Sequence, residues 1–269
     1  MFVKKAQGRR GAKSWPVVVA MTLLLGGCAD TNSSNLAAPA NEGRASVSSD
    51  DHGSLLRMAR AMRQAGDLIS SIQIYRTVVA TKSVTPEILV EYGDVLLESG
   101  SPDDAIDIYS QIDGKSPARL SALLGMTRAY INLGEPTKAL DFVDKAQLLA
   151  PQDARVLVDR GVALDALKRH AEAQQSYRAV LAAAPRHVSA RNDLALSLAL
   201  TGQYDEALAI IAPLGRSASA TPRVRENMAL IYGLMGDTDH AAIVSRVDLD
   251  EKDTQANLAF LAAVRGTKR

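Results

Sequence analysis

The four histidines of the chain are the side chains best suited to bind a metal ion or to transfer a proton near neutral pH. They are His52, His170, His187 and His240, and no two of them have the close spacing that puts two ligands on one helix. Each falls in a connecting segment of the pattern described below. We therefore expect solvent-exposed histidines and no metal site built from them.

A row of carboxylates is the second candidate for chemistry. Glu87, Glu91, Asp94 and Glu98 are spaced at i, i+4, i+7 and i+11, which places them on one face of a helix. Four carboxylates along one helix rarely converge on a single ion, so the row does not indicate a metal site. The sequence shows no glycine-rich phosphate loop and no Ser/His/Asp arrangement. We therefore predict that the protein is not an enzyme and needs no cofactor.

The single cysteine, Cys28, follows a segment with the layout of a secretory signal peptide. Basic residues between Lys4 and Lys13 precede an apolar run at residues 16–25, which reads PVVVAMTLLL. This run is shorter than the roughly 20 residues that a membrane-spanning helix needs. A chain with one cysteine also has no intramolecular disulfide. Residues 1–27 are therefore predicted to be a signal peptide.

The residues LGGC that end at Cys28 resemble the lipobox of bacterial lipoproteins. In that family the cysteine thiol is lipidated and the chain is cut before it, and each buried methylene contributes about 0.8 kcal/mol to attachment. The resemblance implies lipidation at Cys28; the alternative is an ordinary secretory signal with a stray cysteine. The aspartate that often retains such proteins at the inner membrane would stand at Ala29, but here it is Asp30. By resemblance, this favours an outer-membrane lipoprotein facing the periplasm over an inner-membrane one.

The linker behind the cysteine, within residues 28–52, is rich in small polar residues and has no apolar period. Such a composition predicts disorder. A flexible chain of this length has a span of roughly 25–30 Å, so it would let the remaining chain reach a partner away from the membrane. The alternative is that part of the linker docks on the folded body.

Charge argues against a nucleic-acid partner. The formal net charge is +1, but five basic residues lie within the first 27 positions. The remaining chain carries 26 basic and 30 acidic residues, a balance of −4. A mildly acidic body has no electrostatic attraction for phosphate backbones.

A period of 34 residues organises the rest of the chain. Steps of 34 residues lead through Gly66, Gly100, Gly134, Lys168, Gly202 and Gly236, so that five of the six positions are glycine. Small residues recur seven positions before each turn, at Ala59, Gly93, Thr127, Gly161, Ala195 and Ala229, and five positions after it. Large residues recur four before it and nine after it. Small residues facing large ones indicate two closely packed helices, with the helix backbones nearly touching at the small positions.

A helix–turn–helix unit of 34 residues resembles the tetratricopeptide repeat. The resemblance implies an all-α fold, a right-handed solenoid of about six repeats over residues 53–253. The segment 254–269 would supply a capping helix and a frayed tail, because a terminal repeat must cover the end of the stack.

Several local features are also expected. Ser101 and Asp104 have the spacing of a capping box at the start of a second helix. Pro213 predicts a shortened or kinked second helix in the fifth repeat. Polar Ser245 and Asp248 predict a short second helix in the sixth, followed by an acidic connection at residues 248–253.

In tetratricopeptide arrays the first helix of each pair lines a concave groove, and charged residues of this chain fall there in register. The candidate groove residues are Arg57, Arg60, Arg63, Glu91, Asp94, Glu98, Arg128 and Asn132. One interpretation is a polar groove that grips an extended peptide or a partner helix. The other is that these charges pair across adjacent helices and only stabilise the stack.

The C-terminal half resembles the end of the Flp pilus assembly protein TadD family. The residues that carry the resemblance are ARNDLALSLALTGQYDEAL, RVRENMALIYGLMGDTDHA and DLDEKDTQANLAFLAAVRG. The resemblance implies a lipid-anchored, pilotin-like scaffold whose partners are the secretin or other pilus components. Alternatives are a lipoprotein of type IV pilus assembly or of outer-membrane barrel assembly, and an activator of a periplasmic peptidoglycan enzyme.

Overall fold

The computed structural model describes residues 49–81 and 84–266, with side chains from residue 52 to residue 263. The expected signal peptide, Cys28 and most of the expected linker lie outside the described residues. The described residues form thirteen helices: α1 (Ser49–Gln64), α2 (Leu68–Val79), α3 (Pro86–Glu98), α4 (Pro102–Ser110), α5 (Arg119–Asn132), α6 (Pro136–Leu149), α7 (Ala154–Ala166), α8 (His170–Ala183), α9 (Val188–Leu200), α10 (Tyr204–Gly215), α11 (Pro222–Met235), α12 (Thr238–Ser245) and α13 (Glu251–Gly266).

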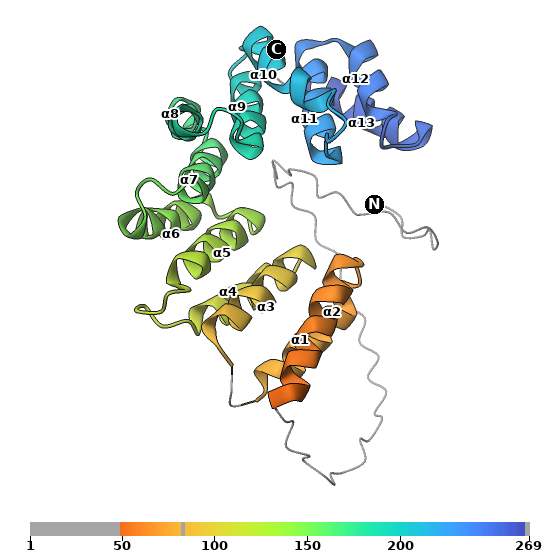
Figure 1. Ribbon diagram of the computed structural model, residues 1–269. Coiled ribbons are helices and arrows are strands. Elements are labelled where there is room, and N and C mark those ends of the chain that lie inside the picture. Colours follow the sequence, from red (N-terminus) through yellow and green to blue (C-terminus); the bar gives the residue numbers. More distant parts are fainter. Residues whose placement is uncertain (1–48, 82–83, 267–269) are drawn as a thin grey trace, which may run out of the picture.

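The helices form six consecutive pairs that stack into a curved array, and α13 covers its C-terminal end (Figure 1). Each helix packs against the next one in the chain. The first helices of neighbouring pairs, from α3 to α11, also contact one another, whereas the second helices have no comparable contacts within the described part of the chain. The first helices therefore line the inner side of the curve. The expected all-α repeat solenoid is confirmed.

One residue of the turn that follows each first helix takes a left-handed backbone conformation in all six pairs. The φ angles run from 62° at Lys168 to 98° at Gly236. Five of the six turn residues are glycines, which adopt this conformation without a steric penalty, and Lys168 is the exception. The 34-residue period is therefore set by one backbone requirement repeated along the chain.

Replacing Lys168 with glycine should stabilise the protein by about 1 kcal/mol, because a side chain in the left-handed region clashes with its own carbonyl. The backbone hydrogen bonds of this turn need no lysine side chain. Urea unfolding should show a higher midpoint for Lys168→Gly at an unchanged slope. Lys168→Ala is the matched control, and an equal gain in that variant would contradict the explanation.

The small and large columns pack against each other as the period requires, but a tyrosine ring rather than a neighbouring backbone fills the space. A Cβ atom built on Gly93 or Gly125 would overlap the ring of Tyr109, and one built on Gly161 would overlap the ring of Tyr177. Both rings are almost fully buried. The expectation that helix backbones nearly touch at Gly93 and Gly161 was therefore wrong.

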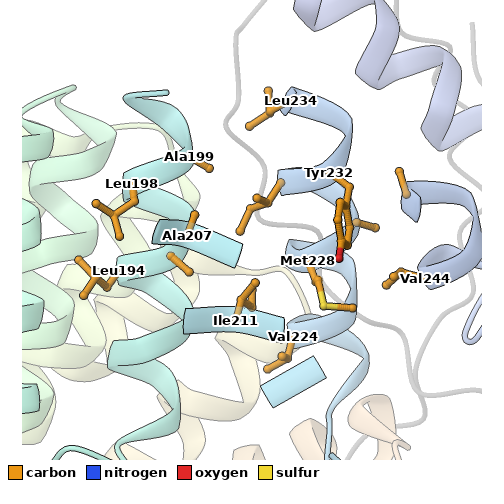
Figure 2. Close-up of a cluster of buried hydrophobic side chains, with 14 of the residues drawn as sticks. Leu194, Leu198, Ala199, Ala207, Ile211, Val224, Met228, Tyr232, Leu234 and Val244 are labelled. Carbon is orange, nitrogen blue, oxygen red and sulfur yellow. The ribbon is translucent and has the colours of Figure 1, made fainter. Parts of the chain in front are cut away.

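The C-terminal core joins seven helices, α7 to α13, into one apolar cluster. Figure 2 shows Ile211 of α10 between α9, which carries Leu194 and Leu198, and α11, which carries Met228; all four residues belong to this cluster. Leu261 of α13 belongs to the same cluster. The cap is therefore continuous with the core of the last pairs.

The first and the last helix of the array each start at an earlier residue than the sequence suggested. Helix α1 starts at Ser49, so residues 49–52, expected in the linker, are helical. Helix α13 starts at Glu251, so the expected acidic connection contributes its first turn. Carboxylates in a first turn favour a helix start because they interact with the positive end of the helix dipole.

Two expectations about second helices also need correction. Ser101 is the N-cap residue of α4, but its side chain makes no capping hydrogen bond, so the capping box is absent. Helix α10 continues past Pro213 to Gly215 and has 12 residues, so the expected shortening is wrong, whereas the alternative expectation, a kink, stays a prediction. The proline lies in the last turn, where its ring interrupts little of the remaining helix. Helix α12, with eight residues, is short as expected.

Candidate protein-binding face

The inner face of the array is formed by side chains six and thirteen positions before each turn residue. These positions are seven residues apart, which places them about 10 Å apart along one face of the first helix. The large core residues, four positions before the turn, point to the opposite side. We call the first set the middle row (Arg60, Asp94, Arg128, Val162, Leu196 and Leu230) and the second the N-terminal row (Glu87, Ser121, Arg155, Ser189 and Arg223).

Two arginines of α1 pair with two glutamates of α3. Nε and Nη2 of Arg60 lie 2.8 and 2.7 Å from the Oε atoms of Glu91, and Arg63 binds Glu98 in the same bidentate way. The Tyr75 hydroxyl also donates to Glu91, at 2.8 Å. Burial would raise the pKa of Glu91, but the hydrogen bonds from Arg60 and Tyr75 outweigh it and lower this pKa. These four charges tie neighbouring pairs together.

The other candidate residues of the N-terminal half do not join this cluster. Asp94 accepts a hydrogen bond of 2.7 Å from the hydroxyl of Tyr109, on the second helix of its own pair. Arg57 is exposed and donates to Ser54 of its own helix. Asn132 is exposed at the end of α5.

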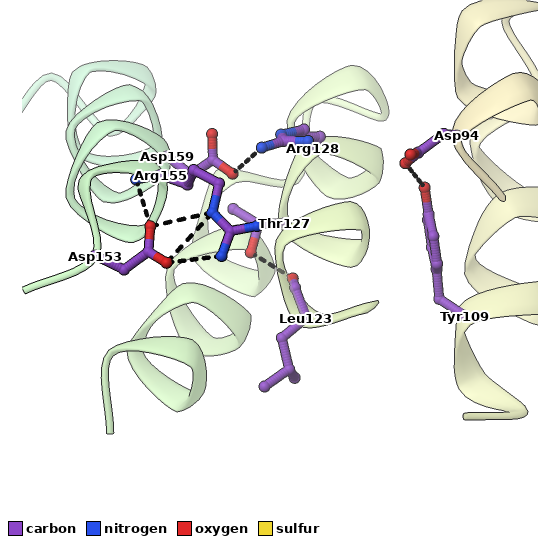
Figure 3. Close-up of polar contacts among 8 residues, drawn as sticks. All are labelled: Asp94, Tyr109, Leu123, Thr127, Arg128, Asp153, Arg155 and Asp159. Carbon is purple, nitrogen blue, oxygen red and sulfur yellow. Dashed lines mark hydrogen bonds and ion pairs between the residues drawn. The ribbon is translucent and has the colours of Figure 1, made fainter. Parts of the chain in front are cut away.

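Arg128 connects α5 to α7 through Asp159. Figure 3 shows the guanidinium pointing toward this carboxylate, and Nη2 lies 3.0 Å from Oδ2. Asp159 is 9% exposed, whereas the side chain of Arg128 is 49% exposed. Burial raises the pKa of Asp159, although Arg128 acts against that rise. A half-exposed arginine is thus held in place by a buried carboxylate.

A similar arrangement connects α9 to α11. Nη2 of Arg223 lies 3.2 Å from Asp193, which also accepts a 2.9 Å hydrogen bond from Asn192. Asn227 then donates to Asn192 across the two helices, at 3.1 Å. Asp193 and both asparagines are buried, and burial raises the pKa of Asp193 despite Arg223. Sequence reasoning missed this network and Asp159, although both aspartates occupy the slot of Glu91 in the 34-residue period.

The buried aspartates give a testable pH dependence. Because the pKa of Asp193 is higher in the folded chain than the ordinary 3.8, its contribution to stability is complete below that value and is lost as pH rises through the folded pKa. Asp193→Asn keeps the hydrogen-bond acceptor but does not titrate. The free energy of unfolding should therefore fall less between about pH 4 and about pH 7 in this variant than in the wild type, measured with urea. An equal fall in both proteins would contradict the explanation.

A Ser/His/Asp set that the sequence did not reveal meets at Asp165. Its carboxylate accepts hydrogen bonds from Ser197 at 2.7 Å and from Tyr177 at 3.0 Å, and His170 Nδ1 lies 2.8 Å away. Nucleophilic catalysis needs the imidazole between carboxylate and hydroxyl, whereas here the carboxylate is in the middle. Ser197 is also fully buried. The set therefore links α7, α8 and α9 structurally.

The middle row changes character in the C-terminal half. Val162, Leu196 and Leu230 replace the charged residues of the first three pairs, and all three are partly exposed. Sequence reasoning missed them because it followed the charges and not the whole column. These aliphatic side chains are candidates for contact with a protein partner.

The described residues contain no group of three or more His, Cys, Asp or Glu side chains arranged to hold a metal ion. None of the helices within the described ranges is both long and apolar enough to cross a membrane.

Comparison with known proteins identifies the repeats directly. Two family models, each described as tetratricopeptide repeat, match residues 96–157 and 166–231 and residues 56–119, together more than half of the chain. Proteins of this kind are generally non-catalytic scaffolds that bind other proteins.

Solved structures of tetratricopeptide repeat proteins have a similar fold. A tetratricopeptide repeat protein from Parabacteroides merdae is 16% identical, with a TM-score of 0.67 over 79% of this chain and 84% of the other. A thermophilic TPR protein from Thermus thermophilus is 21% identical, with a TM-score of 0.59 over 67% of this chain and 98% of the other. At these identities the likeness concerns the fold alone.

Two curated proteins share part of the sequence. The uncharacterized protein y4yS of Sinorhizobium fredii is 31% identical over 90 residues, 34% of this chain and 50% of that protein. Cellulose synthase 2 operon protein C of Komagataeibacter xylinus is 31% identical over 157 residues, 57% of this chain and 12% of that protein. This chain therefore spans about half of the first relative and a small part of the second. With repeats matched over most of the helical array, the chain belongs to the tetratricopeptide repeat family.

Proposed function

We propose that this chain is a lipid-anchored scaffold of the bacterial cell envelope that helps a Flp-type, or tight-adherence, pilus secretion system to assemble. The observation that carries the proposal is the lipobox-like sequence ending at Cys28 ahead of a protein-binding repeat array. The resemblance of residues 190–266 to the TadD family supplies the link to the pilus. Its partners are the secretin or other pilus-assembly components, and it faces the periplasm from the outer membrane.

The inner face supports a role in binding proteins rather than in chemistry. Arg128 and Arg223 are each held by a buried carboxylate and remain about half exposed, at 49% and 53% of their side-chain surface. Each guanidinium carries five N–H donors, more than its one described carboxylate contact uses. Preorganised donors on a curved surface suit recognition of another chain.

Cys28→Ala tests the anchor. We expect the variant to keep its uncleaved signal segment and to remain in the inner membrane, because no thiol is present for lipid attachment. Labelling with a radioactive fatty acid and separation of the two membranes measure both effects. Lipid incorporation into Cys28→Ala would disprove the lipobox interpretation.

Gene deletion tests the pilus role. Surface pili and the heat-resistant secretin multimer should both disappear in the deletion strain and return with the wild-type chain but not with Cys28→Ala. Normal pili in the deletion strain would reject the pilus assignment. Normal pili with altered cell shape would instead favour activation of a peptidoglycan enzyme.

A second candidate is a role in making or exporting an extracellular polysaccharide. The 157-residue similarity to cellulose synthase 2 operon protein C favours it. In that case the deletion strain should lose polysaccharide, measured by dye binding and sugar analysis, while pili and secretin multimers stay normal.

A further inference from the structure

The inner face has two halves of different chemistry. In the first three pairs the middle row is Arg60, Asp94 and Arg128, and in the last three it is Val162, Leu196 and Leu230. All six occupy the same slot of the repeat, on first helices that follow one another around the curve of the array (Figure 1). The face is therefore charged along α1, α3 and α5 and aliphatic along α7, α9 and α11.

The charges at the N-terminal end of the array largely satisfy one another. Arg60 and Arg63 each bind a glutamate of α3 through two nitrogens. A partner would have to compete with these bidentate pairs and desolvate them, which offsets what it gains. This half of the face is better suited to holding the stack together than to taking a ligand.

In the aliphatic half a partner gains apolar contact without having to break ion pairs of the middle row. Val162 and Leu230 pack partly on the C-terminal core, while Leu196 belongs to none of the core clusters found in the described chain. All three are partly exposed, on the first helices that contact one another along the inner side of the curve. Covering this strip with apolar groups of another chain would remove that surface from water, which is favourable.

Arginines border the aliphatic strip on one side. Arg155 and Arg223 stand in the N-terminal row of α7 and α11, seven residues before Val162 and Leu230. Seven residues correspond to about 10 Å along a helix, close to the width of a helix laid across the strip. Arg155 binds Asp153 through Nε and Nη2, and Arg223 binds Asp193 through Nη2 alone. The two arginine side chains are 54% and 53% exposed, whereas the carboxylates of Asp153 and Asp193 are 23% and 8% exposed. The guanidinium groups are therefore the more exposed members of both pairs, and Arg223 keeps more of its N–H donors for a partner.

We infer that the inner face of α7, α9 and α11 binds an amphipathic helix of a partner protein, with an apolar stripe on Val162, Leu196 and Leu230 and an acidic flank on Arg155 and Arg223. First helices packed about 8–10 Å apart make this strip roughly 20 Å long, which four turns of a partner helix span. Charge complementarity selects an acidic rather than a basic helix. The inference rests on the scaffold role proposed above and adds the chemistry of the partner.

The test uses the full chain, purified in detergent, and three synthetic 18-residue peptides labelled with a fluorophore. The first has a leucine stripe flanked by glutamates, the second has lysines in place of the glutamates, and the third has serines in place of the leucines. Fluorescence anisotropy gives the dissociation constants. We expect the first peptide to bind at least about tenfold more tightly than either of the others.

Variants locate the binding site. Leu196→Ser should weaken the acidic peptide about tenfold, because it removes apolar contact area from the centre of the strip. Arg155→Gln should weaken binding about threefold and reduce its dependence on salt. Arg223→Gln combined with Asp193→Asn removes the second border charge without leaving a buried carboxylate unpaired. The matched control is Arg60→Gln with Glu91→Gln, which neutralises a pair at the other end and should leave the affinity within twofold.

Three results would overturn the inference. They are equal binding of acidic and basic peptides, loss of binding in the Arg60/Glu91 control but not in Leu196→Ser, and a concentration-dependent dimer in sedimentation that Leu196→Ser abolishes without any peptide binding. Circular dichroism of each variant ensures that a lost fold is not counted as lost binding. If peptides fail but the deletion strain lacks pili, only this inference is wrong; if peptides bind but pili are normal, only the pilus role is wrong.

Discussion

Replacing Gly161 with leucine should lower the free energy of unfolding by about 3 kcal/mol or more. Even the Cβ atom of an alanine at this position would overlap the ring of Tyr177. That ring is 1% exposed, and its hydroxyl is bonded to Asp165, so it has no room to move aside. The added side chain must therefore separate α7 from α8. Urea unfolding followed by circular dichroism measures the loss.

Ala166→Leu is the matched control for this prediction, because Ala166 lies on the same helix and is exposed. Its effect should stay within about 0.5 kcal/mol. A Gly161→Leu variant as stable as the control would show that the small column is not set by the tyrosine ring.

Arg128→Ala should destabilise the protein by about 3–5 kcal/mol at neutral pH, because it leaves the carboxylate of Asp159 buried without its cation. Asp159 is 9% exposed, and the nearby Asp193 adds to the charge repulsion. Part of the loss should disappear at low pH, where Asp159 takes up a proton. The measurement is urea unfolding at neutral and at acidic pH.

Two variants test whether the loss in Arg128→Ala comes from the unpaired carboxylate and not from removal of an arginine side chain as such. Arg178→Ala removes an arginine that pairs with Glu206 at 3.3 Å, with both side chains about half exposed, and should change stability by less than about 1 kcal/mol. Arg128→Met combined with Asp159→Leu removes both charges together and should be close to neutral. A large loss in this double variant would mean that packing, and not the buried charge, explains the effect of Arg128→Ala.

The period of the sequence was enough to predict the fold. A single requirement, a left-handed residue after each first helix, marks every turn, and Lys168 kept the phase although it is not a glycine. The alternation of small and large residues then identified the helix faces that pack together. These features could be predicted because each one repeats at a fixed spacing, so that several repeats report the same contact.

The polar contacts could not be predicted in the same way. Tyr75, Tyr109 and Tyr177 occupy one column, but their hydroxyls donate to carboxylates at different slots, Glu91, Asp94 and Asp165. Which carboxylate lies within reach depends on distances between helices that a one-dimensional pattern does not contain. The burial of Asp159 and Asp193 could not be predicted either. Their slot in the period holds polar residues, and only the packing of neighbouring helices shows that it is covered.

The ends of the array were predicted least accurately. A first or last helix packs against a neighbouring pair on one side only. Fewer of the periodically spaced small and large residues therefore mark where such a helix starts. Helix α1 begins at Ser49 and α13 at Glu251, both ahead of the expected positions.

The contact between Gly233 and Leu261 limits how this chain can change its length during evolution. A Cβ atom at Gly233 would overlap Leu261. Helix α11, the first helix of the sixth pair, is therefore shaped to receive α13 and not another pair. Earlier first helices carry Arg63, Leu97, Ile131, Asp165 and Ala199 at the equivalent position. A duplicated pair appended after α12 would meet a surface without a matching partner. Gains or losses of repeats by duplication are therefore expected inside the array, ahead of α11, and homologues of different length should share their last pair and cap.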